Sequence, residues 1–155
     1  MAQAGFIADL EPENLARSDG KRPDGMTLVP WSQGESLLWD FTCRDTLCTS
    51  NYGQTSRHAG KAADMAEKEK IEKYQELAKE YQFTPVAVET LGSWGQLSLK
   101  FLEDLGSKIA ANTGDKRSRS FLFQRLGIAI QRGNVISISA TLPNSRKLYE
   151  LFELI

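Results

Sequence analysis

The sequence predicts a mixed α/β fold in which covering helices pack on a central sheet of about four strands. Short apolar runs bounded by turn residues fill the N-terminal third. A stretch rich in Ala, Glu, Lys and Leu follows, with no proline and no interior glycine after its start. A further apolar run separates it from a second segment of helical periodicity, so strands and helices alternate.

Each expected strand is a short apolar run that ends near a chain breaker. The runs are Phe6–Leu10, Met26–Trp31, Ser36–Cys43 and Thr84–Leu91. Pro30 marks the second run as an edge or an end, because proline cannot donate to a sheet ladder. The turn formers at 32–35 predict a hairpin between the second and third runs. The third run is apolar on both faces except at Asp40.

Three segments are expected to be helical, and one of them is ambiguous. Residues 59–82 and 95–111 carry helical patterns, and an ordered loop at 44–58 precedes the first of them. Residues 116–142 fit a helix face, yet their second half also fits a hairpin around Gly133. We favour the helix. The expected order is strand, strand, strand, helix, strand, helix, helix.

Composition indicates an ordinary globular domain and excludes several classes of protein. The 155 residues carry a net charge of −1, so a bulk electrostatic grip on nucleic acid is not indicated. No apolar run reaches the roughly 18 residues of a membrane span, and no signal-peptide pattern opens the chain. Cys43, Cys48 and His58 are too few for a closed zinc site, and we expect reduced thiols in an intracellular protein.

Two carboxylates form the first candidate for a functional site. If the second and third strands pair as a hairpin, Asp24 before one strand and Asp40 late in the next become neighbours. Adjacent carboxylates repel unless a proton or a divalent cation lies between them, and one or two carboxylates commonly hold Mg²⁺. The alternatives are ordinary turn chemistry for Asp24, and a strand cap or a pair with Arg44 for Asp40.

A lysine in an apolar helix stripe forms the second candidate. On a helical wheel the apolar residues of 59–82 lie within about 40° of one line, and Lys70 lies at its centre. Lys73 and Glu67 flank that line on opposite sides. Either the Lys70 stem packs while its ammonium reaches solvent, or Lys70 points at the carboxylates across the helix–sheet interface. The second alternative gives a phosphodiester-cleaving constellation.

The ordered motifs resemble a known nuclease family. In their order, "KRPDG", "LLWDFT", "AGKAADMAEKEKIEKY" and "FTPVAVETLGSWG" resemble the restriction-endonuclease-like domain of non-long-terminal-repeat retrotransposon proteins, part of the PD-(D/E)XK superfamily. The resemblance covers about Ile7 to Leu142, and "QRLGIAIQRGN" is similar to the tail of such elements. It implies an endonuclease that depends on Mg²⁺ or Mn²⁺ and nicks DNA for target-primed reverse transcription.

The resemblance also assigns roles to individual residues. Asp24 and Asp40 would be catalytic metal ligands, and Lys70 would replace the superfamily lysine, whose position Thr42 occupies. The supporting residues would be Lys73, Tyr74 and Glu89, although Glu89 could equally be a plain strand-end residue. DNA contacts are expected from Arg22, Lys73, Arg117 and Arg119. The basic stretch at 115–120, with Arg125 and Arg132, could equally be a solvated helix start.

The sequence departs from the family at its N-terminus. The helix that opens the family core has no counterpart, so we expect an N-terminally truncated domain over 1–155. Residues 1–92 would hold the sheet and catalytic helix, and 93–155 a helical C-terminal extension. Loss of the first helix would expose apolar surface and favour self-association. The competing functions are a nuclear DNA endonuclease, an inactive DNA-binding relic and a protein-interaction module.

Overall fold

The computed structural model describes residues 1–15 and 22–141. Its strands are β1 (Ala8–Leu10), β2 (Gly25–Thr27), β3 (Leu37–Arg44) and β4 (Gln82–Glu89). Its α-helices are α1 (Thr49–Thr55), α2 (Lys61–Lys73), α3 (Gln96–Thr113) and α4 (Ser118–Ala140). Three short 3₁₀ turns are η1 (Ala2–Ala4), η2 (Glu13–Leu15) and η3 (Leu77–Lys79).

The strands form one mixed sheet in the order β1-β2-β3-β4. β1, β2 and β3 are antiparallel neighbours, whereas β3 and β4 run parallel from Leu37↔Gln82 to Arg44↔Glu89. Parallel neighbours require a long crossover, and α1 and α2 supply it here. The predicted mixed α/β class with four strands is therefore confirmed at this level.

The hairpin between β2 and β3 has the expected turn. Gln33 and Gly34 both have positive φ, 52° and 84°, which suits a two-residue turn that matches the twist of paired strands. The register that follows places Gly25 opposite Trp39. A Cβ on Gly25 would lie 2.1 Å from the Trp39 ring, so only glycine fits beneath this indole.

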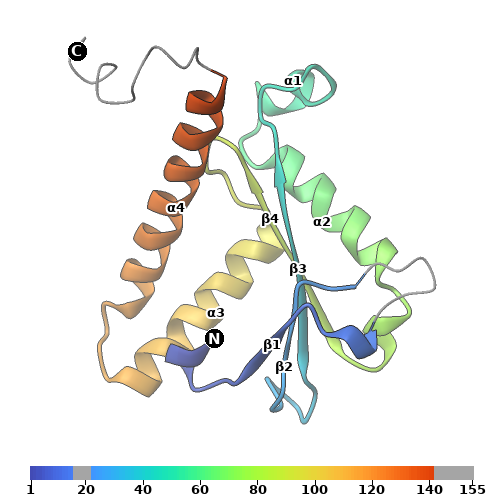
Figure 1. The fold of residues 1–155 in the computed structure, drawn as a ribbon, viewed down its shortest axis with the longest axis vertical. Coiled ribbons are helices and arrows are strands. Elements are labelled where there is room, and N and C mark those ends of the chain that lie inside the picture. Colours follow the sequence, from blue (N-terminus) through green and yellow to red (C-terminus); the bar gives the residue numbers. More distant parts are fainter. Residues whose placement is uncertain (16–21, 142–155) are drawn as a thin grey trace.

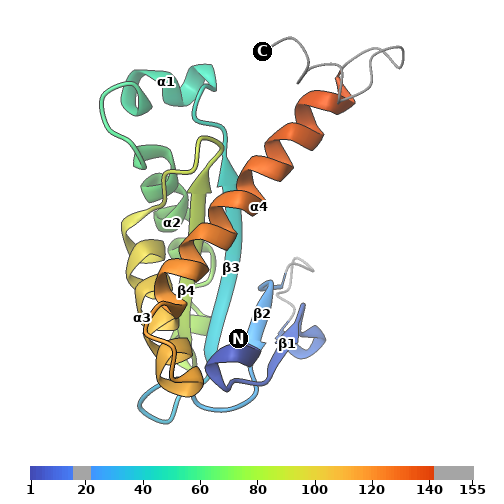
Figure 2. The same ribbon diagram turned by 90° about the vertical axis from the view of Figure 1, so that its left-hand side faces the viewer.

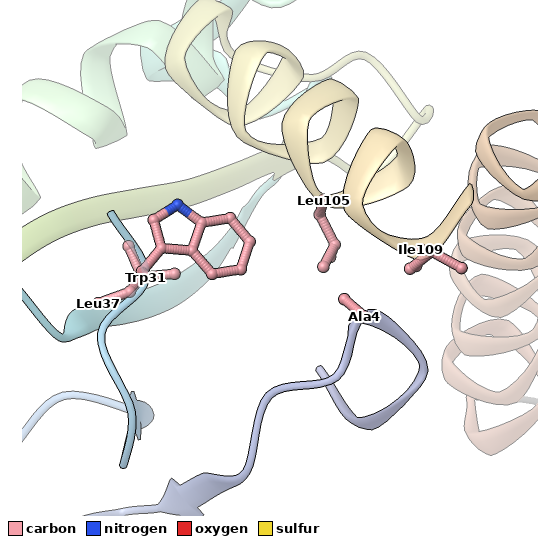
Figure 3. Packing of buried hydrophobic residues seen from close by; sticks show 5 residues of the cluster. All are labelled: Ala4, Trp31, Leu37, Leu105 and Ile109. Atoms are coloured by element: carbon pink, nitrogen blue, oxygen red, sulfur yellow. The ribbon is translucent and has the colours of Figure 1, made fainter. Parts of the chain in front are cut away.

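Helices cover both faces of the sheet (Figure 1). α2 lies on one face, where the small residues Ala63 and Ala66 pack against Ala87 of β4. α3 and the η1 turn lie on the other face, and α4 packs against α3. The main cluster on that side packs η1 and the start of β3 against α3, and Figure 3 shows its residues Ala4, Trp31, Leu37, Leu105 and Ile109.

The observed elements differ from the expected ones mainly at their ends. α2 ends at Lys73 rather than near Gln82, because the chain must reverse there to start β4 beside Leu37. Leu77 therefore lies in η3 and not on the α2 stripe, so that part of the wheel is wrong. α1 was expected as loop, since none of its residues is buried and it has no apolar period to reveal it.

The ambiguous segment is a helix. α4 spans Ser118–Ala140, so the helical alternative is confirmed over these residues and the hairpin is wrong. The expected C-terminal extension thus contains α3 and α4, and its residues 142–155 lie outside the described part of the chain. Among the described residues, no helix has the length and apolar character needed to cross a bilayer.

Candidate functional site

Asp40 is the centre of a polar cluster between the sheet and α2. Its side chain is only 4% exposed. Oδ2 forms an ion pair with the ammonium of Lys70, and Oδ1 accepts a hydrogen bond of 2.7 Å from the Tyr74 hydroxyl. The Nζ of Lys73 lies 4.0 Å from Oδ1. A buried carboxylate needs such partners, because an unpaired charge in this position would cost several kcal/mol.

The end of α2 supplies all three partners from one face. Lys70, Lys73 and Tyr74 stand at positions i, i+3 and i+4, which adjoin on a helix surface. Lys70 therefore crosses the helix–sheet interface to Asp40, and its side chain is 20% exposed. The alternative, in which the Lys70 ammonium simply reaches solvent, does not describe the observed contact. Lys73 donates to the Tyr74 hydroxyl at 2.7 Å and lies 4.3 Å from its ring centre.

Tyr74 ties the cluster to the segment before β2. Its ring is 1% exposed and packs on Phe83 of β4, with centroids 4.9 Å apart. Its hydroxyl lies 2.9 Å from the backbone oxygen of Arg22, in addition to its contact with Asp40. A phenol has one proton, so it donates to one of these acceptors at a time. Tyr74 thus links α2, β3 and the chain that carries Asp24.

Asp24 lies beside Asp40 at the start of β2. The last ladder pair is Gly25↔Trp39, so one further step of the antiparallel register sets Asp24 opposite Asp40. Oδ2 of Asp24 accepts a hydrogen bond of 2.5 Å from the backbone N–H of Phe41. Its backbone oxygen accepts from Glu11 N at 3.0 Å. Glu11, just after β1, and Phe41 of β3 therefore both fix Asp24, while its side chain remains exposed.

The donor set suits a hard cation. Carboxylate oxygens are the ligands that Mg²⁺ prefers, and one or two of them with substrate oxygens and water complete its usual shell. Asp40 already pairs with one positive charge, the Lys70 ammonium, whose side chain is largely shielded from solvent. Over residues 1–15 and 22–141, no group of three or more His, Cys, Asp or Glu side chains gathers as a ready-made cage.

Glu89 lies apart from this cluster. In the parallel ladder Asp40 pairs with Pro85, so Glu89 stands four positions further, about 13 Å along β4. It is fully buried, and its Oε1 accepts from Ala62 N at 2.9 Å at the first turn of α2. Its Oε2 has no hydrogen-bond partner among the described residues. Glu89 therefore caps α2 and does not reach the carboxylate pair.

A second buried carboxylate that sequence reasoning did not assign caps α3. Glu67 on α2 is 2% exposed and accepts from Ser98 N at 2.8 Å and from Ser98 Oγ at 2.6 Å. It also accepts from Leu97 N at 3.1 Å. On the helical wheel Glu67 lies beside the apolar stripe, and this position was the sequence feature that could have indicated a buried carboxylate. Glu67 and Glu89 together fix the angle at which α2 presents Lys70.

The other basic residues expected at DNA are paired with acids. Arg22 pairs with Glu11, and Arg119 lies 2.5 Å from Glu103. Arg117 donates to Asp115, which lowers the pKa of that carboxyl group. Among these candidates the structure brings only Lys73, and the backbone of Arg22, into the Asp40 cluster.

The two cysteines are free thiols and lie outside the cluster. Burial and the nearby Asp45 raise the pKa of Cys43, whereas a hydrogen bond with Ser50 lowers the pKa of Cys48.

Comparison with known proteins adds no assignment to this geometry: no family model and no curated protein matches the chain.

Proposed function

We propose that the chain is a metal-dependent DNA endonuclease that hydrolyses phosphodiester bonds at the Asp40 cluster. The observation that carries the proposal is the buried ion pair of Asp40 and Lys70 across the helix–sheet interface, with Asp24 beside it in register. The resemblance of the ordered motifs to retrotransposon nuclease domains supports the same function. It also supports a PD-(D/E)XK-like core and target-site nicking in the nucleus.

Each residue has a distinct task in this proposal. Asp24 and Asp40 would hold Mg²⁺ or Mn²⁺, which when bound activates water and offsets charge on the phosphate. Lys70 donates to the attacking water or to a phosphate oxygen from its position on α2. Tyr74 orients Asp40, and Lys73 adds positive charge where the scissile phosphate would approach. Thr42, two residues after Asp40, takes no part.

Plasmid nicking tests the proposal. Supercoiled DNA is incubated with the purified chain and Mg²⁺ or Mn²⁺, beside Asp40→Asn, Lys70→Met and the matched control Lys68→Met. Lys68 is exposed on the same helix, so its loss leaves the cluster intact. We expect metal-dependent nicking by the wild type and the control alone. Absence of nicking, or nicking that survives Asp40→Asn, would overturn the proposal.

A non-catalytic DNA-binding module is the second candidate function. The observation in its favour is that both oxygens of Asp40 are already engaged by Lys70 and Tyr74 of the same chain. In that case the cluster fastens α2 to the sheet and does no chemistry. A chain that retards a labelled duplex in gel shift but nicks no plasmid at any metal concentration would match this function and not the first.

A further inference from the structure

An open apolar groove lies on the sheet face opposite α2. It has a volume of about 820 Å³ and is bounded by η1, β1, the sheet and α3. Its lining includes Ile7, Leu10, Trp39, Phe41, Val86 and Phe101. Several of these side chains remain open to solvent, with Leu10 at 72%, Ile7 at 65% and Phe41 at 48%. The groove is thus a concave apolar surface that the described residues leave uncovered.

The outer side of α4 is a second apolar surface. On one side of it Phe121, Ile128, Val135 and Ile138 are exposed, and we call these four residues the α4 stripe. Between residues 126 and 140 the helix carries a single charged residue, Arg132. Helices that are apolar on several sides are normally buried, so a solvated α4 would be unusual. Figure 2 shows α4 crossing in front of the sheet with its C-terminal half rising away from α3.

The groove and the α4 stripe cannot meet within one chain. α4 is one continuous helix of 23 residues, about 35 Å long, that packs on α3 through the side carrying Leu122. The stripe lies on another side of that helix, roughly 120° away at Ile128. One surface is concave and the other is a convex ridge, the combination found where an apolar helix binds in a groove.

We propose that a second copy of this chain fills both surfaces, so that the α4 stripe of each copy lies in the groove of the other. Two-fold exchange gives a closed dimer in which neither the groove nor the α4 stripe of either copy stays exposed. At roughly 150–200 Å² for each large side chain, the exposed fractions correspond to about 340 Å² on the stripe and about 350 Å² in the groove. The resulting area of about 700 Å² per copy lies within the range of a standard stable interface.

Charge is compatible with this arrangement. Arg125 and Arg132 border the α4 stripe, while the described side chains that line the groove are all uncharged. Exchange between copies therefore sets no like-charged side chains against each other. Pairing of two α4 stripes with each other would instead set arginines against arginines and a ridge against a ridge.

Sedimentation equilibrium of the full chain tests the exchange, with Ile128→Glu on the stripe, Leu10→Glu in the groove and Leu47→Glu as control. Leu47 is 64% exposed in the segment before α1, away from both surfaces. We expect a dimer for wild type and control at about 50 µM. For each of the other variants we expect a dimer dissociation constant at least about tenfold larger than that of the wild type. Circular dichroism checks that both variants keep the wild-type fold.

The outcomes separate the possible occupants. A wild-type monomer at concentrations up to several hundred micromolar overturns the proposal and leaves another protein, or another part of this chain, as the occupant. Loss of the dimer in Ile128→Glu but not in Leu10→Glu shows pairing of the stripes alone and also overturns it. The result does not depend on nuclease activity, because neither variant residue lies in the Asp40 cluster.

Discussion

Among single residues, Tyr74 connects more of the candidate site than either carboxylate does. Its hydroxyl lies within hydrogen-bond distance of Asp40, Lys73 and the Arg22 backbone, which belong to three separate segments. Because Oδ1 of Asp40 is buried, removal of the phenol leaves that oxygen with fewer donors. An acceptor without its donor costs more than the hydrogen bond itself contributes.

Tyr74→Phe should therefore lower the free energy of unfolding by about 1–3 kcal/mol, the usual penalty for a buried polar group that loses its partner. Urea denaturation monitored by circular dichroism measures this. Tyr52→Phe is the matched control, because Tyr52 is 59% exposed and its ring should tolerate the change within about 0.5 kcal/mol. Equal stability of the two variants would show that the phenol does not hold the cluster together.

Lys70 and a divalent cation would compete for the same oxygen of Asp40. Lys70→Met should therefore abolish nicking and yet tighten Mn²⁺ binding, by about tenfold or 1.4 kcal/mol. Isothermal titration with Mn²⁺ measures the affinity without reference to turnover. Lys68→Met should leave it unchanged, and Asp40→Asn should remove it. Binding that weakens in Lys70→Met would mean that the ammonium assists the cation and does not compete with it.

At the scale of secondary-structure elements, two buried carboxylates set the helix positions. Glu89 receives the N–H of Ala62 at the start of α2, and Glu67 receives those of Leu97 and Ser98 at the start of α3. A negative charge at a helix N-terminus satisfies free donors and complements the helix dipole. Since α2 carries Lys70, these caps act on the site without touching it.

Gly95→Ala should disrupt the α3 cap. A Cβ at Gly95 would lie 2.2 Å from Oε1 of Glu67, and the backbone φ of −69° carries no strain for alanine, so the effect begins with this clash. We expect a loss of roughly 2–4 kcal/mol in urea denaturation, from the clash and the uncapped donors together.

The control for that clash is Gly127→Ala in α4, where nothing lies within 4 Å of the new Cβ. Helix propensity alone should stabilise this variant by about 0.5–1 kcal/mol. A Gly95→Ala protein as stable as the wild type would mean that Glu67 can move aside without loss.

The sequence predicts elements where one local rule acts and misses them where tertiary contacts decide. The hairpin follows from Gln33-Gly34, and the neighbours Asp24 and Asp40 follow from its register. The end of α2 cannot be predicted in this way, because the helical pattern of the sequence continues past Lys73. The helix ends there because Gln82 must pair with Leu37 in the sheet. Glu89 was placed on the right strand, but its cap on α2 depends on a contact 27 residues away in sequence.

For the whole molecule, the balance of charge would limit how strongly the proposed DNA substrate binds. The chain has 19 basic and 20 acidic side chains. Several arginines that could contact phosphate are already paired, as Arg22 is with Glu11 and Arg119 with Glu103. Each such pair must open before its arginine can replace a counterion on DNA, and the acid left behind then repels the backbone.

Affinity for duplex DNA should therefore depend only weakly on salt. Counterion release gives a slope of about −0.9 per phosphate contact in a plot of log affinity against log salt, and we expect about −2 to −4 in total. Fluorescence anisotropy between 50 and 200 mM salt, with Ca²⁺ in place of Mg²⁺, measures this slope.

Lys73→Met should reduce the slope by about one, because Lys73 lies where the phosphate would approach. The control Lys79→Met should leave the slope unchanged, because Lys79 already pairs with Glu76. A slope of −6 or steeper would mean that the surface ion pairs open on binding, and the paired arginines would then belong to the DNA interface after all.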